Sequence, residues 1–204
     1  MKIAIFASGG GSNFQAIADA CESGHIPGQV VLCVVSRADA GVIQRAERMG
    51  IPQVVLQGST AEWAPAVLKQ LEEASVDLIV LAGFMKMIPM ALIGRFPGRI
   101  LNIHPALLPN FGGKGMYGMH VHEAVIAAGE SESGATVHLV DQDYDTGPIV
   151  AQSRVPVLAN DNAEDLAVRV LKAEHVLYPD VIRAFAENRV RVSGTHITID
   201  PPRP

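Results

Sequence analysis

The chain has 204 residues, of which 49% are apolar and 18% are charged, and its formal net charge is −5 at pH 7. This length suits one domain with a sizeable core, and the composition excludes disorder over most of the chain. The net negative charge supplies no basic surface for a polyanion. We therefore expect no nucleic-acid partner.

The sequence contains no apolar run near the roughly 20 residues that a transmembrane helix needs. Its first residues enter a strand pattern rather than a signal peptide. Cys21 and Cys33, the only cysteines, lie in apolar surroundings and form no Cys-x-x-Cys pair, so we interpret them as reduced, buried thiols. These features predict a cytoplasmic protein without membrane contact.

In the first half of the chain, short apolar runs alternate with helical patterns. The runs lie at residues 3–7, 30–35, 53–56, 78–82 and 100–103, and helices are expected from residue 12 or 13 through 20, at 40–49 and at 62–74. Runs that are apolar on both faces and separated by helices indicate a parallel sheet covered on both sides.

The pattern changes after Pro105. A loop rich in glycine and proline at residues 107–119 leads to a short helix at 121–128. Strands at 135–140 and 149–155 are expected to pair antiparallel, and a long helix runs from 163 to about 187 before a proline-rich, frayed tail. The predicted fold is a single-domain α/β, Rossmann-like open twisted sheet, mostly parallel in its N-terminal half and antiparallel in its C-terminal half, with helices on both faces.

Three consecutive glycines follow the first predicted strand and precede Ser12 and Asn13. A strand, a glycine-rich turn and a helix N-terminus together form a typical anion site. The dinucleotide pattern is incomplete, because its third glycine is replaced by Phe14 and no acidic residue ends the second strand, and the Walker lysine is absent. A tight turn that binds nothing is the alternative, but the pattern favours a cradle for a single phosphate.

Asn102 and His104 alternate along a predicted strand, so both side chains emerge on one face at its carboxyl end. Ligands of open parallel sheets bind at that edge. An amide beside an imidazole can stabilise an oxyanion and move a proton, although each residue alone fits an ordinary structural role.

The segment from residue 141 to 145 holds three carboxylates, and Asp145 is our candidate to orient a histidine or a water. The simplest interpretation of Asp141 and Asp143 is that they are solvated charges in a loop. A metal site built from His120, His122 and His138 with an aspartate is the rival constellation. No His-Glu-x-x-His motif supports it, and we expect no metal.

Five stretches together closely resemble the phosphoribosylglycinamide formyltransferases of purine biosynthesis, over residues 3 to about 190. Their order and spacing are more specific than any one of them. The stretches are Ser8-Gly9-x-Gly11-Ser12-Asn13, Leu81-Ala82-Gly83-Phe84-Met85, Asn102-Ile103-His104-Pro105-Ala106-Leu107-Leu108-Pro109, Asp145-x-Gly147-Pro148 and Glu174-His175-x-x-Tyr178-Pro179.

The resemblance implies formyl transfer from 10-formyltetrahydrofolate to the amine of glycinamide ribonucleotide, by direct amine attack. It implies that His104 and Asn102 stabilise the oxyanion, that His104 acts as general acid, and that Asp145 keeps His104 protonated or orders a relaying water. By the same resemblance the ribonucleotide-binding residues are Gly11, Ser12, Asn13 and Glu174. The folate-binding residues are Met85, Lys86, Met87, Ile88, Asn102, Val140, Asp141 and Asp145.

The resemblance divides residues 1–204 into a phosphate-binding half to about 100, a catalytic and folate-binding half from about 101 to 190, and a tail from about 191. A monomer or a homodimer is expected. Lys86 stands where many members have arginine, and the loop at residues 111–118 is longer and richer in glycine than in several members. That loop is either a lid or a passive surface segment.

Two other functions stay open from the sequence. Water instead of an amine would make the protein a formyl-folate hydrolase, and loss of chemistry would leave a nucleotide-binding module. The related methionyl-tRNA formyltransferase and formyltetrahydrofolate deformylase carry additional domains that 204 residues do not accommodate. The intact Asn102, His104 and Asp145 argue against a module without chemistry.

Overall fold

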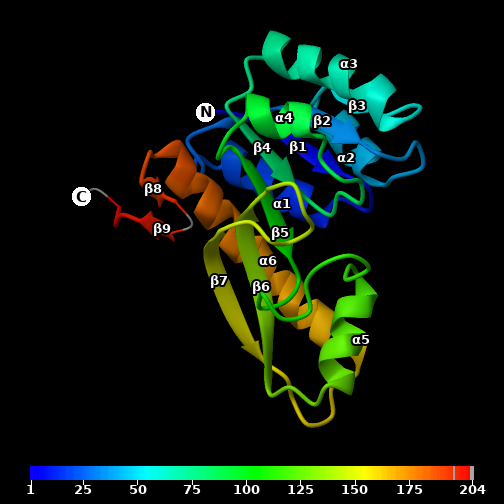
Figure 1. The fold of residues 1–204 in the computed structure, drawn as a ribbon, viewed down its shortest axis with the longest axis vertical. Coiled ribbons are helices and arrows are strands. Elements are labelled where there is room, and N and C mark those ends of the chain that lie inside the picture. Colours follow the sequence, from blue (N-terminus) through cyan, green and yellow to red (C-terminus); the bar gives the residue numbers. More distant parts are fainter. Residues whose placement is uncertain (195, 203–204) are drawn as a thin grey trace. The chain divides into compact units, whose positions relative to one another are not determined.

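The computed structural model describes every residue except 195, 203 and 204. The chain forms two compact units that meet in sequence between Asn102 and Ile103 (Figure 1). The first unit contains β1 (Lys2–Ala7), α1 (Ser12–Glu22), β2 (Gln29–Val35), α2 (Val42–Arg48), β3 (Gln53–Val55), α3 (Thr60–Glu73), β4 (Leu78–Leu81), α4 (Met90–Arg95) and the first three residues of β5 (Ile100–His104).

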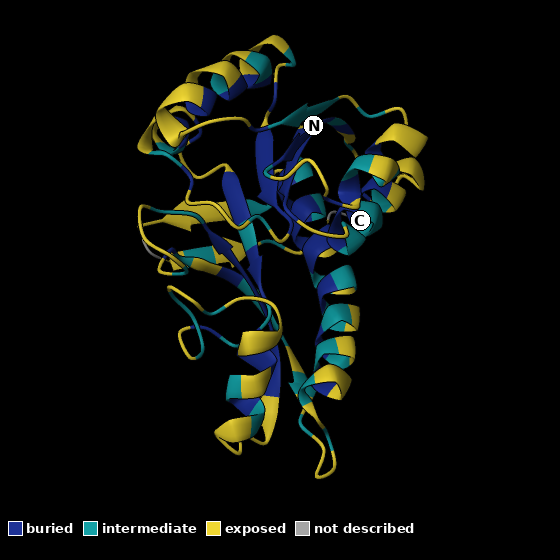
Figure 2. Cartoon of the chain, turned by 90° about the vertical axis from the view of Figure 1, so that its right-hand side faces the viewer, coloured by how far each residue is buried: buried dark blue, intermediate teal, exposed yellow. Residues whose placement is uncertain are grey.

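The strands of the first unit are parallel and lie in the order β3-β2-β1-β4-β5. Strands β2 and β3 thus lie on one side of β1, and β4 and β5 lie on the other. In open α/β sheets, ligands bind at the point where the strand order reverses in this way. The interior strands β1 and β4 are almost wholly buried, as their continuous apolar runs predict (Figure 2). Helix α1 contacts α2 and β2, α2 also contacts β2 and β3, and α3 contacts α4.

Two helices of the first unit differ from the sequence prediction. Helix α3 begins at Thr60 because Ser59 and Glu62 form a capping box, in which Glu62 accepts a hydrogen bond from the Ser59 N–H at 2.6 Å. The prediction placed its start at Glu62 and overlooked this box. Helix α4 was not predicted, since its six residues are too few for a helical period to emerge.

The second unit contains α5 (Met119–Ala127), β6 (Glu132–Leu139), β7 (Ile149–Pro156), α6 (Ala163–Ala186), β8 (Val190–Ser193) and β9 (His196–Ile199). Strands β6 and β7 pair antiparallel, and α6 packs against both strands and against α5. Its buried residues follow a helical spacing and include Leu166, Val170, Glu174 and Tyr178. The parallel N-terminal strands and antiparallel C-terminal strands confirm the predicted fold class.

The segment assigned to a tail from about residue 191 contains the antiparallel pair β8 and β9 instead. Val190, Val192, Ile197 and Ile199 alternate with polar residues on either side of Gly194, which has a φ of 60°, and this pattern is typical of a hairpin. Positions 203 and 204 of the predicted frayed end lie outside the described residues. In the part of the chain that the structure describes, no helix is long and apolar enough to cross a membrane.

The turn between β6 and β7 folds back tightly onto the end of β6. A Cβ atom at Gly147 would overlap the Leu139 carbonyl oxygen, so only glycine fits there. Asp145, two residues earlier, has a φ of 58°, in the left-handed region that aspartate adopts more readily than most residues. The backbone of this turn therefore requires Gly147 and favours an aspartate at residue 145.

We expect Gly147→Ala to lower the free energy of unfolding by about 2 kcal/mol or more, because the added methyl group forces the turn away from Leu139. Gly94→Ala is the matched control, since a Cβ there meets nothing within 4 Å and the residue lies in α4. Urea denaturation measures both variants. Equal stability of the two alanine variants would contradict this account of the turn.

Candidate active site

The glycine loop joins β1 to α1 in the first unit. Gly11 is the N-cap of α1 and has a φ of 77°, and no side chain caps this helix end. A Cβ at Gly9 or Gly10 would meet nothing within 4 Å, whereas a Cβ at Gly11 would lie 2.7 Å from Val42 Cγ2. The fold thus requires glycine at Gly11, and the open space at the other two suits a ligand that approaches the backbone.

Ser8 connects the glycine loop to the segment that carries Met85, Lys86, Met87 and Ile88. Its buried Oγ accepts hydrogen bonds from the Met85 N–H at 2.8 Å and from Ser36 Oγ at 2.6 Å. Met85 and Met87 are 47% and 48% exposed, and Lys86 is also exposed, while Ile88 is buried. Three of the four predicted folate-binding residues in this segment are therefore accessible, and Ile88 anchors the segment in the core.

In the second unit, the Asp145 carboxylate lies between two buried histidines. His104 Nδ1 is 3.5 Å from Asp145 Oδ2, and His138 Nε2 is 3.4 Å from Asp145 Oδ1. The side chains of His104 and His138 are 4% and 3% exposed, and that of Asp145 is 11% exposed. The structure thus brings together His104 and Asp145 as predicted, and adds His138.

Backbone groups fix the remaining polar atoms of this cluster. The Phe111 carbonyl lies 2.7 Å from His104 Nε2, and the Leu139 carbonyl lies 2.8 Å from His138 Nδ1. A carbonyl only accepts, so Nε2 of His104 carries a proton, and its Nδ1, which faces Asp145, is the nitrogen left to bind or release one. The Gly113 N–H donates to Asp145 Oδ2 at 2.9 Å.

Burial is the largest influence on His104 and lowers its pKa, although Asp145 and the Phe111 carbonyl act in the opposite direction. Burial raises the pKa of Asp145, but the contacts with His138 and His104 and the Gly113 N–H outweigh it, so the net pKa is lowered. Both shifts favour a neutral imidazole beside an ionised carboxylate at neutral pH. The cluster is then able to take up a proton.

Buried hydrogen bonds hold the loop that follows His104. Thr136 Oγ1 on β6 donates to the Ala106 carbonyl at 2.6 Å and accepts from the Leu108 N–H at 3.0 Å. Gln152 on β7 donates to the Leu108 carbonyl at 2.9 Å. These bonds attach the His-Pro-x-Leu-Leu-Pro stretch to the strands that also carry His138 and the Asp145 turn.

The other predicted residues have separate surroundings. Glu174 is buried on α6, Val140 and Asp141 are half-buried, and Asn102 pairs with Leu81 in the register of β5 on β4. The Asp141 carboxylate accepts from Thr146 Oγ1 at 2.7 Å and organises the turn. Within the described residues, no three His, Cys, Asp or Glu side chains are grouped so that they hold a metal ion.

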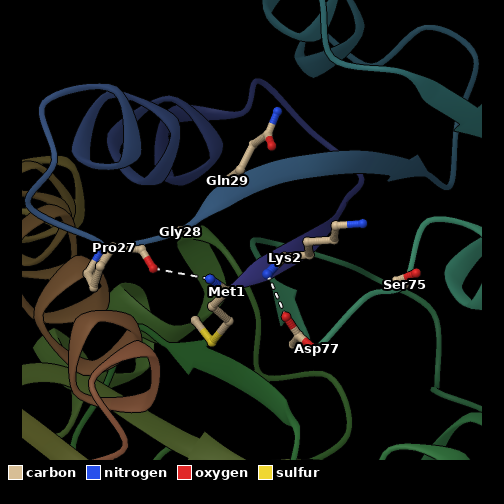
Figure 3. Close-up of a pocket in the computed structure, with 7 residues that line it drawn as sticks. All are labelled: Met1, Lys2, Pro27, Gly28, Gln29, Ser75 and Asp77. Carbon is tan, nitrogen blue, oxygen red and sulfur yellow. Dashed lines mark hydrogen bonds between the residues drawn. The ribbon is translucent and has the colours of Figure 1, made fainter.

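One shallow hollow of about 370 Å³ in the first unit contains none of the predicted site residues. It lies at the amino-terminal ends of β1 and β2, whereas the glycine loop follows the carboxyl end of β1. Figure 3 shows the terminal amine of Met1 donating to the Pro27 carbonyl at 3.2 Å and the Lys2 N–H donating to Asp77 at 2.7 Å. These hydrogen bonds satisfy polar groups of the chain itself, and we therefore interpret the hollow as structural rather than as a ligand site.

From the sequence, His138 was expected only as a ligand of the rival metal site, and its contact with Asp145 was not predicted. Strand alternation could have predicted this contact, because His138 shares a face of β6 with Thr136 and precedes Asp145 by seven residues. No residue pattern predicts the contacts of the Phe111 carbonyl with His104 and of the Gly113 N–H with Asp145, because these contacts depend on backbone geometry.

The model of the formyl transferase family matches residues 1–182 of the chain. The phosphoribosylglycinamide formyltransferase of Escherichia coli is 37% identical, with 100% of this chain and 95% of that protein covered. The chloroplastic phosphoribosylglycinamide formyltransferase of Arabidopsis thaliana is 49% identical, with 93% of this chain and 67% of the relative covered.

The solved structures agree. Glycinamide ribonucleotide transformylase 1 from Symbiobacterium toebii has a TM-score of 0.91 and 39% identity, with 98% of this chain and 93% of that chain covered. A formyltetrahydrofolate deformylase from Pseudomonas syringae, 22% identical with a TM-score of 0.86, shares the fold alone. The chain therefore belongs to the formyl transferase family, and within it to the phosphoribosylglycinamide formyltransferases.

We expect His138→Leu to raise the pKa of the Asp145 carboxyl, because the leucine removes a group that stabilises the ionised form. Titration of the Asp145 carboxyl ¹³C signal by NMR measures this shift. His175→Leu is the control, since His175 is a half-buried histidine on α6 with no contact to Asp145 among those described. An unchanged Asp145 titration in His138→Leu would refute the assigned contact.

We expect the free energy of unfolding to fall as the pH is lowered below about 6.5. Burial lowers the pKa of His104, His122 and His175, so the unfolded chain binds protons that the folded chain resists. Urea denaturation at pH 7.5 and 5.5 measures this dependence. His122→Gln should show a smaller loss between the two pH values, and an identical slope would contradict the assignment to His122.

Proposed function

We propose that the protein transfers the formyl group of 10-formyltetrahydrofolate to the amine of glycinamide ribonucleotide, in de novo purine biosynthesis. The observation that carries this proposal is the buried Asp145 carboxylate beside the proton-accepting nitrogen of His104. Membership of the phosphoribosylglycinamide formyltransferases supplies the substrates. The finer roles below rest on this cluster and on the glycine loop.

The proposed reaction is a direct attack of the substrate amine on the formyl carbon. A C–N bond forms to the amine, and the bond between the formyl carbon and the folate nitrogen breaks. The amine must lose a proton and the leaving nitrogen must gain one. A neutral His104 beside ionised Asp145 is suited to receive the first proton, directly or through a water held by Asp145, and to deliver the second.

Asn102 precedes His104 by two residues on β5, so the two side chains share a face of the strand. We propose that the Asn102 amide donates to the oxyanion of the tetrahedral intermediate and that the positive charge of the protonated His104 stabilises it. His138 is proposed to act through Asp145 as a positioning residue. Its Nε2 lies 3.4 Å from Asp145 Oδ1, whereas His104 approaches Oδ2.

Substrate binding is assigned by the family resemblance and by accessibility. We propose that Gly11, Ser12 and Asn13 bind the phosphate of the ribonucleotide, through N–H donors at the start of α1. Glu174 is proposed to bind the remainder of the ribonucleotide. The proposed folate contacts are Met85, Lys86, Met87, Ile88, Asn102, Val140, Asp141 and Asp145. We propose a cytoplasmic location and a monomer or homodimer.

We expect Asp145→Asn and His104→Ala each to lower kcat by roughly 100-fold or more, because either change removes a partner in proton transfer. The assay supplies 10-formyltetrahydrofolate with and without glycinamide ribonucleotide, and circular dichroism verifies that each variant is folded. Asp143→Asn is the control, since Asp143 is exposed in the same turn.

Acceptor-dependent transfer that disappears in both variants would support the proposal. Formate release without the ribonucleotide would assign the protein to the hydrolases instead. Wild-type rates in Asp145→Asn would contradict the proposed proton transfer.

A further inference from the structure

Helix α2 holds two carbonyl groups of the glycine loop. The Val42 N–H donates to the Gly9 carbonyl at 3.1 Å, and Arg45 Nε donates to the Gly10 carbonyl at 2.7 Å. In a planar trans peptide, the carbonyl and the N–H of the following residue point in opposite directions. The N–H groups of Gly10 and Gly11 therefore point away from the groups on α2 that bind these carbonyls.

This orientation matters for an anion. A carbonyl that faced a phosphate would repel it, whereas successive N–H groups attract it. Among the described residues, the N–H groups of Gly10 and Gly11 have no acceptor. The absence of a side chain leaves open space beside Gly10. The loop thus presents donors, provided that its carbonyl groups stay fastened to α2.

Arg45 is itself held at two points. Its Nη1 donates to Gln15 Oε1 on α1 at 3.2 Å, while its Nε binds the Gly10 carbonyl. Gln15 is held in turn by donating to Asp19 Oδ1 at 2.7 Å. A planar guanidinium with several fixed donors can satisfy both acceptors at once, which a lysine ammonium on a flexible stem cannot reproduce.

Helix α2 packs so closely against the glycine loop that the loop has little conformational freedom. A Cβ at Gly11 would lie 2.7 Å from the Val42 side chain, which is wholly buried. Val42 is the first residue of α2 and Arg45 lies three residues later, one helical turn along. The backbone contact and the guanidinium contact therefore come from one side of a short, well-packed helix.

We propose that Arg45 is a positioning residue for phosphate binding, which fixes the Gly10 peptide so that the loop N–H groups face the anion. This inference rests on the proposed function, since it assigns the loop to the phosphate of the ribonucleotide. It concerns binding of one substrate and leaves the proton-transfer cluster unaffected.

The test compares Arg45→Met, Arg45→Lys and Arg48→Met with the wild type. Arg48 is the matched control, because it is exposed on the same helix and its removal changes the net charge equally. Inorganic phosphate is titrated while the Gly10 and Gly11 amide signals are followed by NMR. Steady-state assays give KM and kcat for glycinamide ribonucleotide, direct titration gives the Kd for formyl folate, and thermal melting verifies folding.

Arg45→Met is expected to weaken phosphate binding and raise the ribonucleotide KM by roughly 10- to 100-fold, the range for losing a hydrogen bond from a charged group. The kcat at saturation and the formyl-folate Kd should stay near those of Arg48→Met. Arg45→Lys should recover only part of the loss, because it restores the charge without the planar fork.

Equal phosphate binding by Arg45→Met and Arg48→Met would overturn the proposal, and so would full recovery in Arg45→Lys, which would reduce Arg45 to a source of charge. An equal loss of affinity for formyl folate would indicate general damage to the unit and would also overturn it. If the wild type binds neither phosphate nor ribonucleotide, the proposed function fails together with this inference.

Discussion

The Asp145 carboxylate between two buried imidazoles is the interaction on which the second unit depends. Each imidazole uses one nitrogen on a backbone carbonyl, and the other nitrogen lies 3.4 to 3.5 Å from the carboxylate. These separations are slightly longer than a charge-assisted hydrogen bond. The arrangement suits a cluster with space for one more proton, and a reaction that moves a proton from an amine to a leaving nitrogen requires such a cluster.

The surrounding backbone is shaped to keep this carboxylate in place. Asp145 occupies a left-handed conformation, and Gly147 lies so close to the Leu139 carbonyl that no other residue fits. The Gly113 N–H adds a third contact to the carboxylate. The backbone of this turn therefore requires Gly147, and its conformation keeps the Asp145 carboxylate between the two imidazoles.

The sequence predicted the parallel sheet of the first unit well, because β1, β2 and β4 are buried on both faces and read as continuous apolar runs. It also predicted that the Asp145 carboxylate lies close to a histidine, and the structure brings it next to His104. It missed α4 and the β8–β9 hairpin, whose short elements bury too little surface to impose a clear period. A residue pattern could not predict that the Phe111 carbonyl binds His104, because every residue has a carbonyl group.

For the glycine loop, too, the sequence predicted one part of the site and not another. The three glycines predicted an anion site, yet only Gly11 is required by the fold itself, through its left-handed φ and its contact with Val42. The contribution of α2 was not predictable, since Arg45 lies 35 residues from the carbonyl that it binds. Spatial proximity created by the sheet order, rather than any local motif, brings these groups together.

The most direct test of the account is the protonation state of His104 in the resting enzyme. Imidazole ¹⁵N chemical shifts at pH 7.5 distinguish a neutral ring protonated on Nε2 from an imidazolium. The account predicts the neutral ring, with its bare Nδ1 facing Asp145. An imidazolium at that pH would contradict it, because the cluster would already hold the proton that it is proposed to receive from the amine.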